Sequence, residues 1–131
     1  MITEDYVSFE VAKLLKEKGF HEKVNHVYHY YTTAPFYQRH LRDFNGEDYK
    51  NLRHEHYSAP TLQMAMKWLR EVYRILILVE YDSPVFSSDI YKMDDIDEYG
   101  SAKHVPPTFA NCKNYEQAIE TAIKYCLENL I

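Results

Sequence analysis

The sequence predicts an α+β fold, a two-layer domain in which about three helices pack on a small antiparallel or mixed sheet. Three observations indicate this class. Residues 115–130 keep a helical period over four turns, residues 60–73 form a second periodic segment, and the β-branched run 75–81 follows that segment without a break. A chain of 131 residues has the length of one domain, so we predict a single α+β domain over 1–131.

The first predicted helix covers residues 9–18. Ser8 is a good N-cap because its hydroxyl can accept a hydrogen bond from a free amide of the first turn. Gly19 suits the left-handed position after the helix, and Phe20 can then contact Leu15. These residues predict both ends of the helix.

The segment after this helix is rich in valine and tyrosine. Residues 23–32 have the composition of a strand. Residues 33–58 show no firm period, although "FNGED" at 44–48 offers a turn. Because so long a loop is unusual in a small domain, we expect a further strand or short helix there.

The second helix should begin at Pro60, which fits the first helical position because its missing amide costs nothing there. It should end near Tyr73. Residues 75–81 are apolar on both faces, which is typical of a central strand covered on both sides or of a packed edge.

The remaining segments complete the expected sheet and the last helix. Residues 85–93 are a plausible antiparallel partner of 75–81, whereas the acidic "DDIDEYG" and the following "HVPPTF" are expected to form loop. Asn114 and Gln117 form a capping-box pattern before a helix. Its expected buried stripe consists of Tyr115, Ala118, Ile119, Ala122, Ile123, Cys126, Leu127 and Leu130.

The net charge of -5 comes from one part of the chain. Residues 1–81 contain equal numbers of basic and acidic residues. The excess of acidic residues lies in a group between 82 and 98: Asp82, Asp89, Asp94, Asp95, Asp97 and Glu98. Such a patch repels a phosphate backbone, which argues against nucleic-acid binding. An EF-hand calcium loop is rejected because Tyr99 and Pro106 stand where that pattern needs oxygen ligands.

The chain has no apolar run near the roughly 20 residues of a membrane span. Its acidic start, "MITEDYV", lacks the pattern of a secretory leader, so we expect a cytoplasmic protein without membrane contact. The two cysteines are expected to be unpaired: Cys112 in a loop and Cys126 on the last helix.

Motifs that would indicate an enzyme are absent from the sequence. It contains no nucleophile elbow, phosphate loop or dinucleotide fingerprint, and only three glycines. The paired carboxylates lie in the acidic segment, where no apolar surroundings would raise their pKa values. We therefore predict no catalytic residue and no cofactor.

The region from His26 to Tyr57 departs most from average composition, with five of the seven histidines and six of the thirteen tyrosines. If residues 54–56 form a strand, His54 and His56 share a face, and His26 or His29 could complete a metal-ligand set. The alternative is that these histidines are exposed or line the core.

The same region could form a protein interface, because tyrosine and arginine are enriched in interface cores. The alternative is that about half of these side chains line the core. The candidates are Tyr28, Tyr30, Tyr31, Phe36, Tyr37, Arg39, Arg42, Tyr49, Arg53 and Tyr57.

The segments "FEVAKLLKEKGF", "APTLQMAMKWLREV" and "YEQAIETAIKYCLENLI" resemble small uncharacterised proteins of gut bacteria and their phages or other mobile elements. The resemblance implies a shared scaffold and genomic context. It implies no activity, and no functional residue is carried over.

We therefore expect a small non-enzymatic protein-interaction or self-associating module, most simply a homodimer. The alternative from another class is a metal-dependent or small-molecule enzyme that uses His26, His29, His54 and His56.

Overall fold

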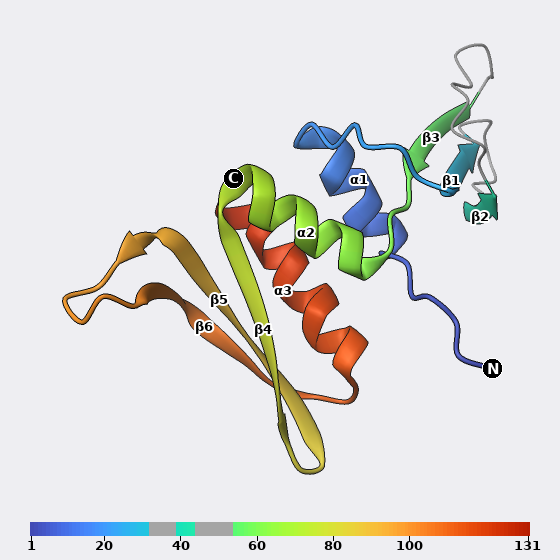
Figure 1. The fold of residues 1–131 in the computed structure, drawn as a ribbon. Helices are drawn as coiled ribbons and strands as arrows, with labels where there is room; N and C mark the ends of the chain where they lie inside the picture. The colour runs from blue at the N-terminus through green and yellow to red at the C-terminus, as the bar shows by residue number, and fades with distance from the viewer. Residues whose placement is uncertain (32–38, 44–53) are drawn as a thin grey trace. The chain divides into compact units, whose positions relative to one another are not determined.

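The computed structural model describes residues 1–31, 39–43 and 54–131 (Figure 1). Those residues form three helices and two three-stranded antiparallel sheets, which confirms the α+β class. The strands are thus divided between two sheets. The chain separates into two compact units, residues 1–61 and 62–131, and each is described by itself. The prediction of a single domain stays a prediction.

The first unit begins with helix α1, Phe9–Glu17. The Ser8 hydroxyl accepts a hydrogen bond from the Val11 amide at 3.2 Å, which confirms the predicted N-cap. Gly19 has a φ of 91°, and the Phe20 amide donates to the Leu15 carbonyl at 2.9 Å. The predicted helix end is therefore confirmed as a Schellman closure.

The sheet of the first unit has the order β2-β1-β3, with β1 at His26–Tyr31, β2 at Arg39–Asp43 and β3 at His54–Ser58. The strand expected within 23–32 is confirmed. The region 33–58, where a strand or short helix was expected, contributes two strands within the residues that are described. The turn predicted at 44–48 lies outside the described residues.

The prediction that a helix begins at Pro60 is wrong. Pro60 accepts a hydrogen bond at its carbonyl from the Val7 amide at 3.0 Å, and Thr61 forms an antiparallel bridge with Tyr6. This extended pairing holds both residues out of a helical conformation. Helix α2, Leu62–Tyr73, therefore starts two positions later and ends where expected.

The second unit consists of α2, α3 and one sheet. Helix α3, Tyr115–Asn129, is capped by Asn114, whose side chain accepts from the Gln117 amide at 2.7 Å. It contacts all three strands of the sheet and also α2. Most of its predicted stripe is buried, from Ala118 to Leu127, while Tyr115 remains exposed.

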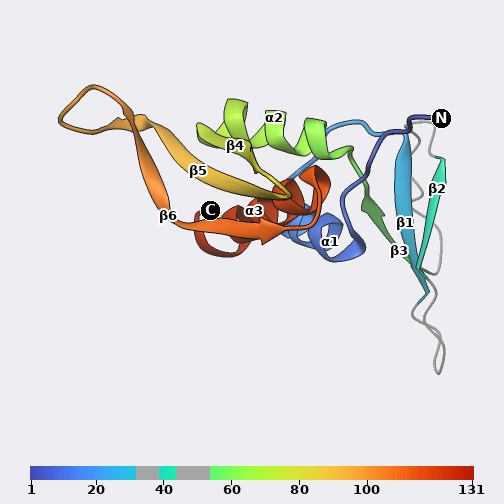
Figure 2. The same ribbon diagram turned by 90° about the horizontal axis from the view of Figure 1, so that it is seen from below.

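The sheet of the second unit has the order β4-β5-β6, with β4 at Ile75–Asp82, β5 at Val85–Ile96 and β6 at Ala102–Cys112 (Figures 1 and 2). The antiparallel pairing of β4 with β5 was predicted. Strand β4 lies at the edge, so the alternative of a central strand covered on both faces is wrong. Its burial alternates from Ile75 to Leu78, as expected for one covered face.

The loop predicted for "DDIDEYG" and "HVPPTF" is much shorter in the structure, because Asp94–Ile96 extend β5 and the whole of "HVPPTF" lies in β6. Two prolines made this segment look like loop, but an edge strand tolerates proline where no ladder hydrogen bond is needed. The acidic loop shrinks to a turn in which the Asp97 carboxylate accepts from the Tyr99 and Ser101 amides, both at 2.9 Å.

Candidate functional site

Two of the predicted interface tyrosines pack inside the first unit. The Tyr28 hydroxyl donates to the Val7 carbonyl at 2.7 Å, and its ring lies edge-on to Phe9 at 5.7 Å between centroids. Tyr57 is buried, lies edge-on to Phe9 at 5.3 Å, and has the Lys16 ammonium 4.8 Å from its ring centroid. These contacts match the core alternative for both residues.

The other interface candidates lie in β1 and β2 or outside the described residues. Tyr30 and Tyr31 are in β1, with Tyr30 level with Arg39 of β2, and Arg42 is level with Val27. Their role in an interface stays a prediction. Four candidates fall outside the described residues: Phe36, Tyr37, Tyr49 and Arg53.

The strand registers separate the four predicted metal ligands. His29 lies level with His56, and His54 is two positions along β3 from His56, so these three positions share one face of the sheet. His26 is level with Asp43 and falls in the alternate set, on the other face, where its ring lies 4.1 Å from that of Tyr6. The register thus places His26 away from the other three.

A fourth histidine, His40, joins them through the same register. It lies level with His29 on the side of β1 opposite to β3. His40 was not among the predicted ligands, because the pairing of β1 with β2 cannot be read from the local sequence. Among the side chains that the structure describes, which exclude those of His29, His40 and His54, no group of three could hold a metal ion.

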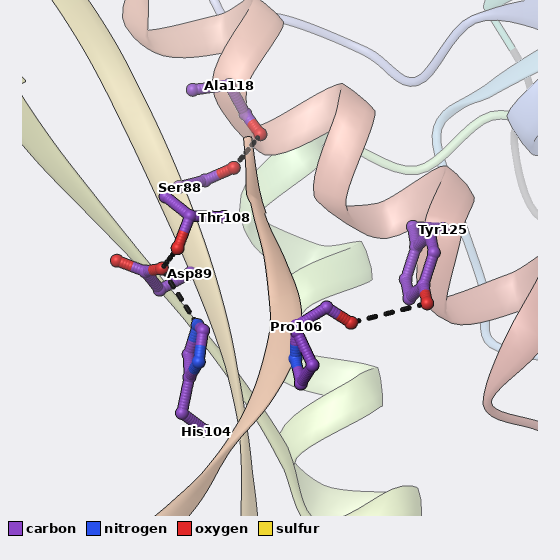
Figure 3. Close-up of polar contacts among 7 residues, drawn as sticks. All are labelled: Ser88, Asp89, His104, Pro106, Thr108, Ala118 and Tyr125. Carbon is purple, nitrogen blue, oxygen red and sulfur yellow. Dashed lines mark hydrogen bonds and ion pairs between the residues drawn. The ribbon is translucent and has the colours of Figure 1, made fainter. Parts of the chain in front are cut away.

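In the second unit, one face of the sheet carries polar groups close together. The Asp89 carboxylate of β5 receives hydrogen bonds from two side chains of β6, the Thr108 hydroxyl and His104 Nε2, the latter at 2.9 Å (Figure 3). On the other face, which α3 covers, the Ser88 hydroxyl donates to the Ala118 carbonyl at 2.8 Å and the Tyr125 hydroxyl donates to the Pro106 carbonyl at 3.3 Å.

These bonds surround an irregularity in the sheet. Ser88 pairs with Phe109 and Ile90 with Val105, so one residue of β5 faces three of β6. Asp89 is that residue, and its carboxylate connects the two sides of the bulge. The cluster therefore replaces ladder hydrogen bonds that the bulge interrupts.

The cluster is not arranged as a nucleophilic triad. In a triad, the hydroxyl gives its proton to the imidazole, and the carboxylate orients the imidazole. Here the Thr108 hydroxyl and His104 both contact the same Asp89 oxygen. The proton of the hydroxyl is thus directed to the carboxylate, and the geometry matches a structural clamp.

The two edges of this sheet differ in how they are protected. Strand β6 carries Pro106, Pro107 and the bulge, all of which hinder pairing with another strand. Strand β4 contains neither proline nor lysine over its eight residues, and no strand in the described part of the chain pairs with its outer side. Leu78 of β4 is 46% exposed on the face opposite to Ile77.

An open hollow of about 370 Å³ lies where β4 begins and α3 ends. Its charged lining consists of Arg74, Lys92, Asp94 and Asp95. The Arg74 guanidinium pairs with Asp94 at 3.2 Å. Because two positively charged side chains accompany two carboxylates, these four side chains carry no net positive charge that would select an anionic ligand.

Both cysteines are free and buried, and Cys112 lies at the end of β6 rather than in the predicted loop. Burial raises the pKa of the Cys126 thiol from 9.0 to about 12. The thiolate, which is the reactive form, is therefore scarce at neutral pH.

No family model, curated protein or solved structure matches the chain. The resemblance to proteins of gut bacteria and their phages stays a prediction. Within the described ranges, no helix has the length and apolar character needed to cross a membrane.

Proposed function

We propose that this protein is a self-associating interaction module whose contact surface is the outer edge of β4. The observation that carries the proposal is the contrast between the two edges of the second sheet. Strand β4 offers eight residues with a largely apolar sequence, whereas β6 is interrupted by Pro106 and Pro107. Backbone amides and carbonyls on an open edge are a template for another strand.

A second copy of β4 is a well-matched occupant of that edge. In an antiparallel pair centred on Ile77, Leu76 comes level with Leu78 of the second copy, and Ile75 with its Val79. Arg74, just before the strand, comes level with Glu80 of the second copy. Apolar residues thus meet apolar residues, and opposite charges meet at both ends.

This register also keeps the faces of the sheet consistent. Residues of the helix-covered set, such as Ile75 and Ile77, meet residues of the same set, as a continuous sheet requires. The result is a six-stranded sheet across two chains. The alternative centre on Leu78 would place Leu76 against Glu80, which is a poorer match.

The test is the native mass of the full chain and of a Leu78→Lys variant, measured by light scattering behind a sizing column over a wide concentration range. The wild type should be a dimer. The variant should be a monomer, because two lysines would face the apolar pairs at the new strand contact. Since Leu78 is already about half exposed, folding stability should change by only about 0.5 kcal/mol.

Val72→Lys is the matched control, because Val72 is 55% exposed on α2 and not on the β4 edge. It should leave the native mass unchanged. Glu80→Lys should weaken the dimer centred on Ile77, because it would then face Arg74. A wild type that is monomeric at every concentration contradicts self-association, and equal effects of Leu78→Lys and Val72→Lys contradict the assignment to β4.

A further inference from the structure

Two groups of aromatic side chains lie in the second unit, one near each end of β4. Where the strand ends, the Tyr81 ring lies 5.0 Å from that of Phe86, and Phe86 lies edge-on to Tyr115 of α3 at 6.2 Å between centroids. Just before the strand begins, the Tyr73 ring lies edge-on to that of Trp68 in α2 at 5.1 Å. Each copy of the chain thus carries an aromatic group at both ends of this strand.

Both groups belong to the face of the sheet that the helices cover. Tyr81 is four positions after Ile77 along β4, and alternate residues of a strand share a face. Tyr73 lines the open hollow together with Ile75, a buried residue of the same set, and with Leu130 at the end of α3. A strand that pairs with the outer side of β4 therefore brings its own aromatic group to this face.

The register proposed for the β4 pair aligns the two groups between copies. In an antiparallel pair centred on Ile77, position 81 of one copy comes level with position 73 of the other. Only Arg74 separates Tyr73 from the strand, so Tyr73 lies beside the place where that pairing ends. Tyr81 of one copy then meets Tyr73 of the second copy, and the two-fold axis repeats the contact.

Both tyrosines are accessible to a second copy. Tyr81 is 61% exposed, although its ring packs on Phe86 and its hydroxyl donates to the Ser83 hydroxyl at 3.3 Å. Because these contacts already restrict the ring, little side-chain entropy is lost when a partner covers it. Tyr73 is 37% exposed and borders the hollow of about 370 Å³, which leaves space beside its ring.

We propose that Tyr81 of one copy packs against Tyr73 of a second copy, and that this contact, made twice, sets the register of the β4 pair. The proposal rests on the self-association proposed above and identifies the side chains that make it specific. A second copy suits the site because the same register also aligns Arg74 with Glu80. Aromatic pairs contribute beyond the area they bury, and tyrosine is enriched where interfaces are most sensitive to substitution.

The experiment measures the dimer dissociation constant of the full chain by sedimentation equilibrium for the wild type, Tyr81→Ala, Tyr73→Ala and the double variant. Each single substitution should weaken the dimer by about 10- to 100-fold, because two aromatic contacts are lost per dimer. The double variant should be weakened about as much as either single variant, because each substitution removes the same contacts. Effects that multiply would overturn the proposal, and they are expected if the pair is centred on Leu78, with Tyr81 level with Ile75.

Tyr99→Ala is the matched control, because Tyr99 is 84% exposed in the turn between β5 and β6. It should leave the dissociation constant unchanged. If Leu78→Lys abolishes the dimer but Tyr81→Ala leaves its affinity unchanged, pairing through β4 stands and the aromatic contact is overturned. A wild type that is monomeric at every concentration overturns both proposals.

Trp68 gives a test that needs no substitution, because it is the only tryptophan in the chain and its ring contacts that of Tyr73. As the wild type is diluted, tryptophan emission should change over the same concentration range as the native mass. Emission that stays constant while the mass halves would overturn the proposal, even if a variant at Tyr73 or Tyr81 failed to fold.

Discussion

Cys126 shows what burial does to a single side chain. Its position on the buried stripe of the last helix was predicted from the helical period, and the structure confirms complete burial. Because the interior cannot solvate a thiolate, the pKa rises to about 12. The same burial makes the residue a packing element at neutral pH rather than a nucleophile.

This shift predicts a loss of stability in alkaline solution. The unfolded chain releases the Cys126 proton near pH 9, whereas the folded chain keeps it until about pH 12. The stability that comes from keeping this thiol protonated in the folded state is therefore complete below pH 9. It is lost as the pH rises from 9 to 12, by up to about 1.4 kcal/mol per pH unit. The measurement is the free energy of unfolding against pH for the wild type and for Cys126→Ala.

The variant should lose stability less steeply between pH 9 and pH 12, so the difference between the two curves should change with pH there. Other groups titrate in the same range but are common to both proteins. Parallel curves across that window would contradict the assignment to Cys126.

The roles of residues that cap helices were predictable from the sequence. The positions of residues relative to one another across paired strands were not. Ser8, Gly19 and Asn114 were identified because a cap depends on neighbours within a few positions. His40 was missed because its relation to His29 depends on which strands pair and in what register. No local pattern carries that information.

At the scale of elements, β6 is the clearest case where local sequence misled. Its two prolines indicated loop, yet the strand runs from Ala102 to Cys112 as an edge with a bulge. The clamp of Asp89 with Thr108 and His104 supports the pairing on both sides of that bulge. Tertiary pairing therefore overrides the local preference here.

We predict that Asp89→Ala destabilises the protein by about 1–2 kcal/mol, because two hydrogen bonds to a carboxylate are lost across the bulge. Asp89 keeps only 17% of its side-chain surface exposed, so water replaces these bonds poorly. Asp89→Asn should cost less, since the amide oxygen can still accept. Urea unfolding measures both effects.

Asp82→Ala is the control for this prediction, because Asp82 is exposed at the end of β4. It should have little effect. If Asp89→Ala and Asp82→Ala are equally stable, the cluster at the bulge does not support β6.

At the scale of the whole molecule, the α+β class followed from helical periods and β-branched runs, but the division of strands between two sheets did not. Residues 75–81 were recognised as a strand, and their apolar run left open whether they were central or at an edge. Sheet order depends on long-range pairing, which composition does not determine.

The second unit contains its own helices and sheet, with α3 across all three strands. We therefore predict that a fragment of residues 62–131 folds without residues 1–61. Circular dichroism and proton NMR should show helix signals, dispersed amide resonances and a cooperative thermal transition. An unfolded fragment would favour the single domain that length and composition predict.

The prolines of β6 determine how large an assembly built on this sheet can become. A chain that adds neighbours at both edges of a sheet can continue into a fibre, whereas a chain with one usable edge stops when two copies meet. Pro106 and Pro107 interrupt one of the two edges. The pairing through β4 that we propose would thus be self-limiting. The two prolines, which made β6 look like a loop in the sequence, would prevent open-ended polymerisation.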